Sequence, residues 1–546
     1  MSYSMDKSEQ AEIEIPSRFN VATLLVDENV RKGRGEKVVY YYHHDDEARC
    51  RKVTYRELQS SVNKTGNVLK HVGVELENRV MLLQNDSPEL VAGLLGAMKI
   101  GAVPFVANTL LTPEEYEYLL NDSRARVAIV DEEYVDKIEK IRDELRYLKN
   151  LIVIGEARGD QLSYYELLKE SSTELEAVDL SKDEILLWQY SSGTTGPPKG
   201  IMHMQRNIMY STETYYKRIL GLHEKDVCFS ASKIFFGFGQ GNSVWAPLRW
   251  GASAVLYPGR PLPERVFEII ERYGVTILFS APTHYNAMLQ VKDAEKKYDL
   301  SSLRLCVSAG EALPPILYES WKKRFKTDVL DGIGCTEGFH IFISNRPGLV
   351  KPGSSGRPVP GYEARIVDEK FRDVSTGEIG NLLVKGGSIA FGYWGKYDKM
   401  KKAFLGEWLS TGDMYLKDEE GNYWHCGRSD DMIKSGGAWV SPVEVERTLM
   451  EHPAVLEAAA IPSYTPEGLQ KVKGFVRLKS GYQPSPELAE ELKAFVKSKI
   501  APYKRPEWIE FVTELPKTAT GKILRYKLRQ LERERLSRIR EELTKT

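Results

Sequence analysis

The segment Tyr190–Gly200 reads Tyr-Ser-Ser-Gly-Thr-Thr-Gly-Pro-Pro-Lys-Gly and is the stretch that most narrows the choice of fold. It follows the apolar run Ile185–Tyr190, which we predict to be a buried strand, and we expect a helix to begin near His203. Its three glycines let backbone N–H groups gather around phosphate oxygens, while the hydroxyls and Lys199 add hydrogen bonds and positive charge. The segment lacks the Gly-Lys-Ser/Thr ending of a Walker A loop. A flexible surface loop is the alternative, but two adjacent prolines stiffen the segment and favour phosphate binding.

Strand and helix patterns alternate on both sides of this loop. Before it, Arg56–Val72 and Pro88–Ile100 have helical periodicity, and Arg79–Leu83 and Val127–Val130 have the composition of strands. After it, further strands are predicted at Val227–Ser230, Ala254–Tyr257, Thr276–Phe279 and Leu305–Val307. Strands that alternate with helices form parallel sheets from βαβ units. We therefore expect an α/β fold whose large N-terminal domain holds two parallel-type sheets with helices.

The pattern changes twice toward the C-terminus. Short strands with turn residues between Gly361 and Val384 predict a small β-barrel. A boundary near Gly427–Asp431 then separates an N-terminal domain, residues 1–429, from a small α+β C-terminal domain, residues 430–546. The C-terminal domain is predicted to contain helices at Val443–Met450 and Pro486–Ile500, strands at Val455–Ile461, Gly474–Leu478 and Trp508–Val512, and a charged helix at Leu524–Leu543.

The composition argues against several classes of protein. Hydrophobic residues make up 42% and charged residues 28% of the chain, as in ordinary globular domains. The formal net charge of −1 gives no field that would attract nucleic acid or an anionic membrane. Five scattered cysteines without a C-x-x-C pair argue against a disulfide framework or a zinc site and favour a reducing, cytoplasmic setting. Met1–Pro16 lacks the apolar core of a signal peptide, and Leu90–Ala107 has the pattern of a helix, a turn and a strand rather than of a membrane span.

Together with the phosphate loop, four later segments resemble the adenylate-forming superfamily of acyl-CoA synthetases, firefly luciferases and peptide-synthetase adenylation domains. They are Gly332–Glu337, Ser410–Asp413, Gly427–Gly437 and Pro516–Ile523, and they follow in family order and spacing. The resemblance covers nearly the whole chain. It implies an ATP-dependent enzyme that converts a carboxylic acid into its acyl-AMP and passes the acyl group to the thiol of coenzyme A. It also implies a magnesium ion and a mobile C-terminal domain that turns between the two steps.

The resemblance assigns the central chemistry to a few side chains. Glu337 would bind Mg²⁺, which prefers hard carboxylate and phosphate oxygens, and Thr336 would contact phosphate. Lys522 would bridge the acid and the α-phosphate and stabilise charge in the transition state. Asp413 would accept hydrogen bonds from both ribose hydroxyls, with Arg428 assisting there or at the phosphate. Taken alone, Lys522 fits an ordinary surface lysine and Asp413 a turn or helix-capping aspartate, so only the motifs favour these roles.

Other positions on the nucleotide and CoA sides follow from the same resemblance. The phosphate-loop residues are Ser191, Ser192, Gly193, Thr194, Thr195, Gly196 and Lys199, and the adenine-side residues are Gly310, Glu311, Asp331, Gly332 and Ile333. Ile333 departs from the family, where an aromatic residue commonly flanks adenine, so apolar packing remains and ring stacking is lost. Gly436 and Gly437 would form the loop that admits the pantetheine arm of CoA, with an ordinary turn as the alternative. Asp430 would be the hinge, with an ordinary charged loop residue as the alternative.

The segment Lys233–Asn242 lies where the superfamily builds its acid pocket, and it is aromatic and glycine-rich. Amino-acid-activating members place an aspartate at the position of Gly237, so this uncharged residue disfavours amino acids. The nearest group that we recognise is the benzoate–CoA ligases, indicated by Asn345-Arg346-Pro347, by Thr336-Glu337 before His340-Ile341, and by Ala501–Lys504. By this resemblance the acid pocket is lined by Phe236, Gly237, Phe238, Ala309, His340 and Ile341.

Two departures from the benzoate ligases bear on the choice of acid. Gly237 and Phe238 stand where those enzymes carry alanine and tyrosine. The missing methyl and hydroxyl predict a larger, less polar pocket that is open to benzoate and to other aromatic or alicyclic ring carboxylates. For His340, a satisfied core histidine is the alternative to substrate contact.

Two other functions compete with a CoA ligase. One is a stand-alone adenylation enzyme that loads a carrier protein. The other is a non-catalytic nucleotide-binding protein, which the retention of Lys522, Glu337 and Asp413 opposes. The oligomeric state, monomer or homodimer, is left open.

Overall fold

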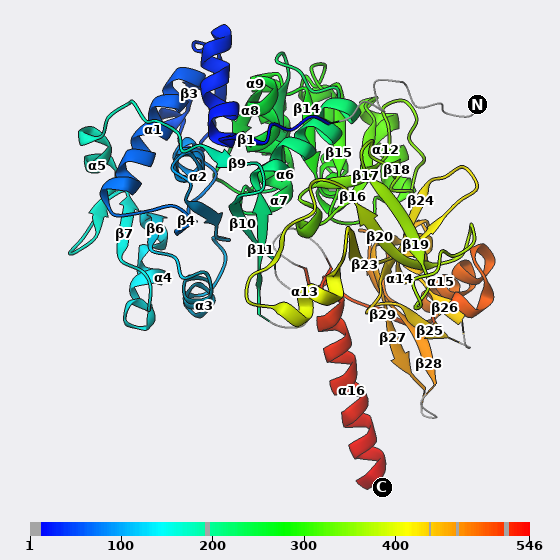
Figure 1. Cartoon of the computed structure of the whole chain (residues 1–546). Helices are drawn as coiled ribbons and strands as arrows, with labels where there is room; N and C mark the ends of the chain where they lie inside the picture. Colours follow the sequence, from blue (N-terminus) through cyan, green and yellow to red (C-terminus); the bar gives the residue numbers. More distant parts are fainter. Residues whose placement is uncertain (1–12, 192–196, 436–437, 466–468, 518–522, 546) are drawn as a thin grey trace.

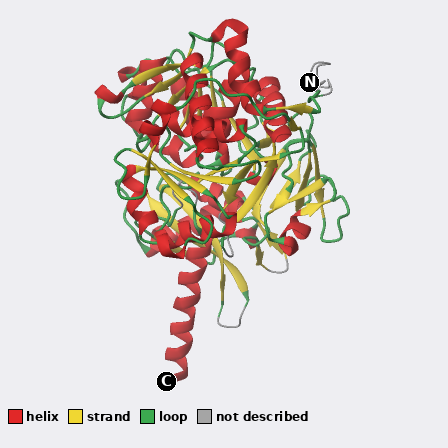
Figure 2. Cartoon of the chain, turned by 60° about the vertical axis from the view of Figure 1, so that its left-hand side comes forward, coloured by secondary structure: helices red, strands yellow, loops and turns green. Residues whose placement is uncertain are grey.

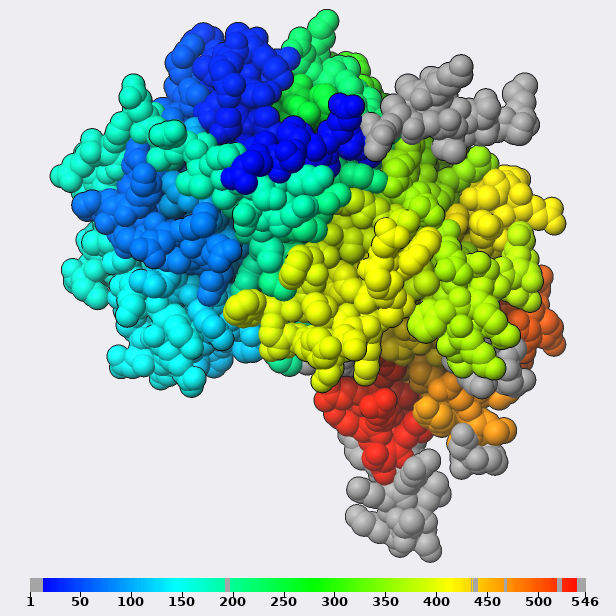
Figure 3. All heavy atoms as spheres, in the orientation of Figure 1, coloured from blue at the N-terminus to red at the C-terminus, as the bar shows by residue number. Residues whose placement is uncertain are grey.

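The computed structural model describes residues 13–191, 197–435, 438–465, 469–517 and 523–545. Its larger part, coloured blue to green in Figure 1, is an α/β assembly, and Figure 2 shows helices covering the sheets. The orange and red C-terminal elements lie together at one corner of the molecule, next to the yellow segment (Figure 3). Among the described residues, no helix has both the length and the apolar character needed to cross a membrane.

A five-stranded parallel sheet, in the order β5-β4-β6-β7-β8, forms one layer of the large part. Its strands are β4 Arg79–Leu83, β5 Val103–Val106, β6 Val127–Asp131, β7 Asn150–Ile154 and β8 Leu162–Ser163. The helices of this region are α1 Tyr55–His71, α2 Pro88–Lys99, α3 Pro113–Ser123, α4 Val135–Glu139 and α5 Tyr164–Glu170. A capping box between Thr54 and Glu57 starts α1, while a Ser87 cap starts α2. The strands and helices predicted here are confirmed to within about a residue.

A nine-stranded sheet, in the order β18-β17-β16-β15-β14-β12-β13-β2-β3, forms the second layer. The strands from β16 to β2 run parallel, and antiparallel strands continue the sheet at both edges. The strands are β2 Val38–Tyr42, β3 Arg51–Thr54, β12 Val227–Ser230, β13 Ser253–Leu256, β14 Ile277–Ser280, β15 Leu305–Ser308, β16 Val329–Gly334, β17 Ile341–Ser344 and β18 Arg357–Pro358. Its helices are α7 Gly237–Gln240, α8 Ala246–Trp250, α9 Pro263–Tyr273, α10 Pro282–Leu289, α11 Ala294–Lys297 and α12 Pro315–Phe325. The expected pair of parallel-type sheets is therefore confirmed.

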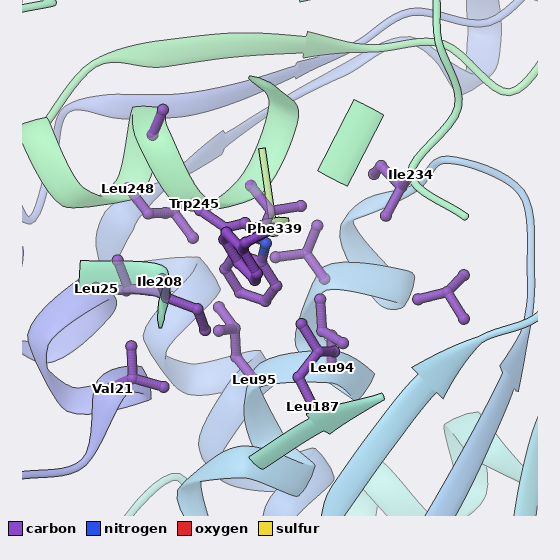
Figure 4. Packing of buried hydrophobic residues seen from close by; sticks show 14 of the residues in the cluster. Val21, Leu25, Leu94, Leu95, Leu187, Ile208, Ile234, Trp245, Leu248 and Phe339 are labelled. Atoms are coloured by element: carbon purple, nitrogen blue, oxygen red, sulfur yellow. The ribbon is translucent and has the colours of Figure 1, made fainter. Parts of the chain in front are cut away.

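The largest buried hydrophobic cluster joins elements of both sheets. Leu94 and Leu95 of α2 meet Trp245, at the end of the π-helix η7 (Gly241–Trp245), and Phe339 belongs to the same cluster (Figure 4). Truncating a fully buried aromatic side chain such as that of Trp245 would cost about 3–5 kcal/mol. Because Phe339 directly precedes His340, this core also fixes the chain that leads into the predicted acid pocket.

The phosphate loop connects two strands of a separate sheet. Strand β10 (Ile185–Ser191) pairs antiparallel with β11 (Lys199–Met204), which also pairs with β21 (Gly392–Tyr393). The helix expected near His203 begins later, since His203 lies inside β11, opposite Leu187, and α6 spans Gln205–Ser211. Two antiparallel strands satisfy each other's backbone groups, so the strand continues past the loop and the helix is delayed.

The small barrel-like unit predicted after Gly361 corresponds to a five-stranded antiparallel sheet. Its strands are β19 Glu363–Val367, β20 Gly380–Lys385, β22 Phe404–Leu405, β23 Trp408–Lys417 and β24 Tyr423–Arg428, and the helix α13 spans Tyr397–Ala403. The ladder between β23 and β24 sets Asp413 directly opposite Arg428.

The C-terminal part has its own sheet and core. Strand β27 (Val455–Tyr464) pairs with β28 (Gln470–Leu478), which runs parallel to β29 (Trp508–Phe511). The helices are α14 Pro442–Met450, α15 Pro486–Lys499 and α16 Arg525–Lys545, with a β25–β26 hairpin of Ile433–Ser435 and Ala438–Val440. A separate buried cluster of these elements includes Val445, Val476 and Leu492. The α+β pattern predicted for this part is confirmed, and the helix α16 projects away from the body (Figure 1).

Candidate active site

Lys199 and Glu337, each predicted to face phosphate or metal, lie side by side. Glu337 belongs to a short 3-10 turn, Thr336–Gly338, that follows β16, and Lys199 opens β11. Lys199 Nζ donates to Glu337 Oε1 over 3.3 Å, and both side chains are largely buried. A lysine beside a carboxylate at the end of a phosphate-type loop can hold an anion and a divalent cation together.

Tyr393 completes this group and was not identified from the sequence. Its hydroxyl donates to Glu337 Oε1 over 2.6 Å, and Lys199 Nζ lies 3.2 Å from the same hydroxyl. Burial raises the pKa of Tyr393, and the Glu337 carboxylate adds to this effect, so the hydroxyl remains a hydrogen-bond donor at neutral pH. The only sequence signal was the run Gly392-Tyr393-Trp394, which carries no chemistry by itself.

Asp413 and Arg428 meet on the adjoining antiparallel sheet. Arg428 Nη1 donates to Asp413 Oδ1 over 3.3 Å, and the Asp413 side chain is only 11% exposed. His425 Nε2 lies 3.7 Å from the same oxygen. Burial lowers the pKa of His425, with Asp413 acting in the opposite direction. The carboxylate is therefore held between a guanidinium and an imidazole.

The adenine-side residues come from two neighbouring strand ends. Asp331, Gly332 and Ile333 lie within β16, and Gly310 and Glu311 follow β15, its parallel neighbour. Asp331 is buried, and its Oδ1 has no hydrogen-bond partner in the part of the chain that the structure describes. Burial raises the pKa of Asp331 to about 7, with the backbone of Leu313 acting against this shift. Parallel strands bring their carboxyl ends to one edge, and ligands bind at such edges.

Four of the residues predicted for the acid pocket, Phe238, Ala309, His340 and Ile341, lie in one largely buried region. The rings of Phe238 and His340 stack with centroids 5.5 Å apart and an interplanar angle of 22°. Ile341 and Ala309 belong to the main buried cluster, and Phe238 packs against it. Phe236 makes an edge contact with its neighbour Phe235, with centroids 4.6 Å apart.

Gly237 borders the side chain of Gln189 rather than open space. A Cβ atom at Gly237 would lie 3.0 Å from Gln189 Oε1, and Gln189 Nε2 donates to Gln240 Oε1 over 2.6 Å. The space that a methyl group at position 237 would need is therefore bordered by the buried carboxamide of Gln189. The sequence did not identify Gln189 as part of this region.

Backbone strain marks the junction between the nucleotide and acid sides. Phe339 has φ 72° and ψ −48°, a conformation that bulky residues rarely adopt. It lies between Glu337 and His340, and its buried ring packs edge-on against His203, with centroids 5.0 Å apart. This turn allows Glu337 to face Lys199 and His340 to face Phe238 within four residues of chain.

The C-terminal part reaches the adenine-side loop. The Ile523 backbone N–H donates to Glu311 Oε1 over 3.1 Å, while Thr283 Oγ1 donates to Glu311 Oε2 over 3.0 Å. Asp430 lies in the turn after β24, with its Oδ1 3.9 Å from Arg428 Nε. The remaining predicted site residues, Ser192, Gly193, Thr194, Thr195, Gly196, Gly436, Gly437 and Lys522, lie outside the described residues, whereas Ser191 ends β10.

Comparison with known proteins finds relatives that match nearly the whole chain. Residues 26–394 match the family described as AMP-binding enzyme, and residues 444–522 match the AMP-binding enzyme C-terminal domain. The chain is 46% identical over 519 residues to a benzoate–CoA ligase of Thauera aromatica, covering 95% of this chain and 97% of that protein. An anthranilate–CoA ligase solved in complex with anthranoyl-AMP is similar with a TM-score of 0.90 and 46% identity, over 95% of this chain and 98% of its own. A benzoate–CoA ligase from Burkholderia xenovorans is similar with a TM-score of 0.85 and 41% identity, over 94% of this chain and 100% of its own.

Proposed function

The chain belongs to the AMP-binding enzyme family, and we propose that it is an ATP-dependent acid–CoA ligase that acts on aromatic or alicyclic ring carboxylates. The main support for an ATP-dependent step is the contact of Lys199 with Glu337 next to the phosphate loop. The stacked Phe238 and His340 support a flat ring as substrate. Relatives that are named benzoate–CoA and anthranilate–CoA ligases support the same class of acid.

In the proposed first step, a carboxylate oxygen of the acid attacks the α-phosphorus of ATP, and the bond to pyrophosphate breaks. Lys199 and the phosphate loop would neutralise the leaving pyrophosphate. Asp413 would hold the ribose hydroxyls, with its carboxylate kept in place by Arg428. Lys522 would stabilise the charge that develops between the acid and the α-phosphate.

In the proposed second step, the CoA thiol gives its proton to solvent and its sulfur attacks the acyl carbon; the bond between that carbon and the AMP phosphate oxygen breaks, so that AMP leaves and the thioester forms. The loop at Gly436 and Gly437 would admit the pantetheine arm. Lys522 and this loop both belong to the proposed C-terminal domain, residues 430–546, and they serve different steps. We therefore propose that the domain turns about Asp430 between the steps. The contact of Ile523 with Glu311 supports the assignment of the described arrangement to the first step.

The residues present fit a magnesium ion. Glu337 offers a carboxylate beside the phosphate loop, and no group of three or more metal-ligating side chains occurs among the described residues. Because Mg²⁺ uses few protein ligands together with substrate phosphates, a single carboxylate is sufficient. When bound, the ion would neutralise charge on the β- and γ-phosphates.

Isotope exchange between ATP and pyrophosphate tests the proposal. We expect exchange that depends on benzoate, and release of AMP that depends on added CoA. Exchange without CoA-dependent AMP release would favour a stand-alone adenylation enzyme that loads a carrier protein. Absence of exchange with every ring acid and with acetate would favour a non-catalytic nucleotide-binding protein.

A further inference from the structure

His340 is held by a chain of two hydrogen bonds. Its Nε2 lies 2.7 Å from the hydroxyl of Tyr216, and this hydroxyl donates to Asn242 Oδ1 over 2.7 Å. All three side chains are buried. Gly241 permits the close approach, because a Cβ atom there would lie 2.6 Å from His340 Cδ2 and 2.5 Å from the Tyr216 oxygen.

This chain fixes which nitrogen of His340 carries the proton. A tyrosine hydroxyl has one hydrogen, and here it is donated to Asn242 Oδ1. The Tyr216 oxygen can then only accept from His340, so Nε2 carries the imidazole proton and Nδ1 keeps a free lone pair. Burial lowers the pKa of His340 to about 3, with a weaker opposing influence from the Phe238 backbone, so the ring is neutral at pH 7.

The acceptor at Nδ1 is unused within the protein. It is sealed from solvent and has no hydrogen-bond partner in the part of the chain that the structure describes. A buried acceptor without a partner is unfavourable, whereas most buried polar atoms in native proteins are paired. The His340 ring stacks on Phe238, another residue predicted to line the acid pocket.

We infer that His340 Nδ1 accepts a hydrogen bond from an amino or hydroxyl group on the ring of the substrate, and that Tyr216 and Asn242 are positioning residues that hold His340 as an acceptor. This inference rests on the proposed function and narrows its substrate class from ring carboxylates to ring carboxylates that bear a hydrogen-bond donor. A pocket that hydrogen-bonds its substrate discriminates strongly against analogues that lack the bonding group.

Matched pairs of acids test this inference on the unmodified protein. The kcat/KM for thioester formation is measured for 2-, 3- and 4-aminobenzoate and for the methylbenzoate with its substituent at the same position. Methyl and amino groups are similar in size, so each pair isolates the donor. In at least one pair, we expect the kcat/KM of the aminobenzoate to exceed that of the methylbenzoate by roughly tenfold or more. Equal or higher values for the methyl acid in all three pairs would overturn the inference.

Two tyrosine variants test the role of the chain. Tyr216→Phe should bring the amino-to-methyl ratio close to one, because the hydroxyl that holds Nε2 protonated is lost. Tyr215→Phe is the matched control, since this buried tyrosine lies against the same imidazole, with centroids 5.4 Å apart, but its hydroxyl is outside the chain. The ratio should keep its unmodified value in the control. If the amino-to-methyl ratio is unchanged in Tyr216→Phe, Tyr216 does not hold His340 as an acceptor.

Nitrogen-15 NMR of the histidine side chains gives a readout independent of turnover. The His340 resonances, assigned by their absence in His340→Phe, should show a protonated Nε2 and an unprotonated Nδ1, and the opposite tautomer would overturn the inference. If no ring acid supports ATP–pyrophosphate exchange, the proposed function itself fails. If benzoate and the methylbenzoates are used as well as the aminobenzoates, only the present inference fails.

Discussion

The backbone N–H of Ile523 donates to Glu311 Oε1 over 3.1 Å, which joins the C-terminal part of the chain to the adenine-side loop. Ile523 directly follows Lys522 in the sequence. The contact therefore brings Ile523, the sequence neighbour of the predicted catalytic lysine, to the nucleotide side of the site.

Replacement of Lys522 by alanine should slow adenylation by about 3–4 kcal/mol of barrier, because a cation near the α-phosphate is lost. Thioester formation from preformed acyl-AMP should survive, since that step does not use the lysine. Pyrophosphate release and acyl transfer are measured separately. Lys517→Ala is the matched control, because Lys517 lies on the same segment and pairs with Glu457. Equal loss in both half-reactions would contradict the assigned role.

Tyr393→Phe should slow adenylation and raise the magnesium concentration that the reaction requires. The variant removes the hydroxyl that donates to Glu337 Oε1 over 2.6 Å, so the carboxylate loses part of its orientation. We expect an adenylation rate about 10-fold lower, consistent with the loss of a hydrogen bond to a charged group, and a higher magnesium requirement. Titration of the exchange reaction with Mg²⁺ measures both. Tyr397→Phe, at an exposed tyrosine of α13, is the control and should behave as the unmodified protein does. An unchanged magnesium requirement in Tyr393→Phe would show that the Tyr393 hydroxyl does not contribute to the metal site.

Ring acids should be used far better than acetate or long-chain fatty acids. The reason is the uncharged aromatic wall at Phe238 and His340. A competition assay with benzoate, cyclohexanecarboxylate, cyclohexenecarboxylate, acetate and palmitate measures the order. Acetate or palmitate in first place would contradict the ring-acid assignment.

The double variant Gly237→Ala with Phe238→Tyr should shift preference from bulkier rings toward benzoate. The new methyl group would meet Gln189 Oε1 at 3.0 Å, so the Gln189 carboxamide must move by a few tenths of an ångström. We expect this movement to narrow the pocket. The ratio of kcat/KM for benzoate and cyclohexanecarboxylate measures the shift, and a ratio that moves toward the larger ring would show that Gly237 does not limit pocket size.

Asp430→Pro should trap one placement of the C-terminal domain. Proline fixes φ near −65°, whereas a hinge needs freedom in one or two dihedrals. Benzoate-dependent pyrophosphate release should stay nearly intact and transfer to CoA should be lost. Loss of both activities together with a lower melting temperature would indicate general destabilisation and remove Asp430 as the hinge.

Acidification should destabilise the protein through His203. This fully buried histidine has a pKa lowered by burial to about 4, so between pH 6.5 and 4 the unfolded chain binds a proton that the folded chain does not. Its contribution to stability is present above pH 6.5 and falls by about 2 kcal/mol on reaching pH 5. Asp331, whose pKa is raised to about 7, acts in the opposite direction, so the comparison must be made with a variant.

His203→Asn provides that comparison. Urea unfolding of both proteins is measured at pH 7 and pH 5. We expect the unmodified protein to lose about 2 kcal/mol more than His203→Asn over this interval. Parallel losses in the two proteins would show that His203 titrates alike in the folded and unfolded states.

The sequence predicted most elements because their signals are local. Strand-like apolar runs located β4, β6 and β12, and helical periodicity located α1 and α2. The position of the first helix after the phosphate loop was wrong, since the strand containing His203 is stabilised by pairing with β10 and β21. Pairing of that kind depends on residues far along the chain and leaves little trace in local composition.

By itself, the sequence determined the order of the motifs, the alternation of strands and helices, and the residue types available for phosphate, ribose and acid. Only the tertiary structure decided which side chains complete each group: Tyr393 reaches Lys199 across 194 positions of chain, and Tyr216 reaches His340 across 124. Such partners are selected by burial and by strand register, because a polar atom removed from water must find whatever donor or acceptor the fold brings near it. A linear motif records the residue that performs a role, whereas the residue that orients it is set by packing in three dimensions.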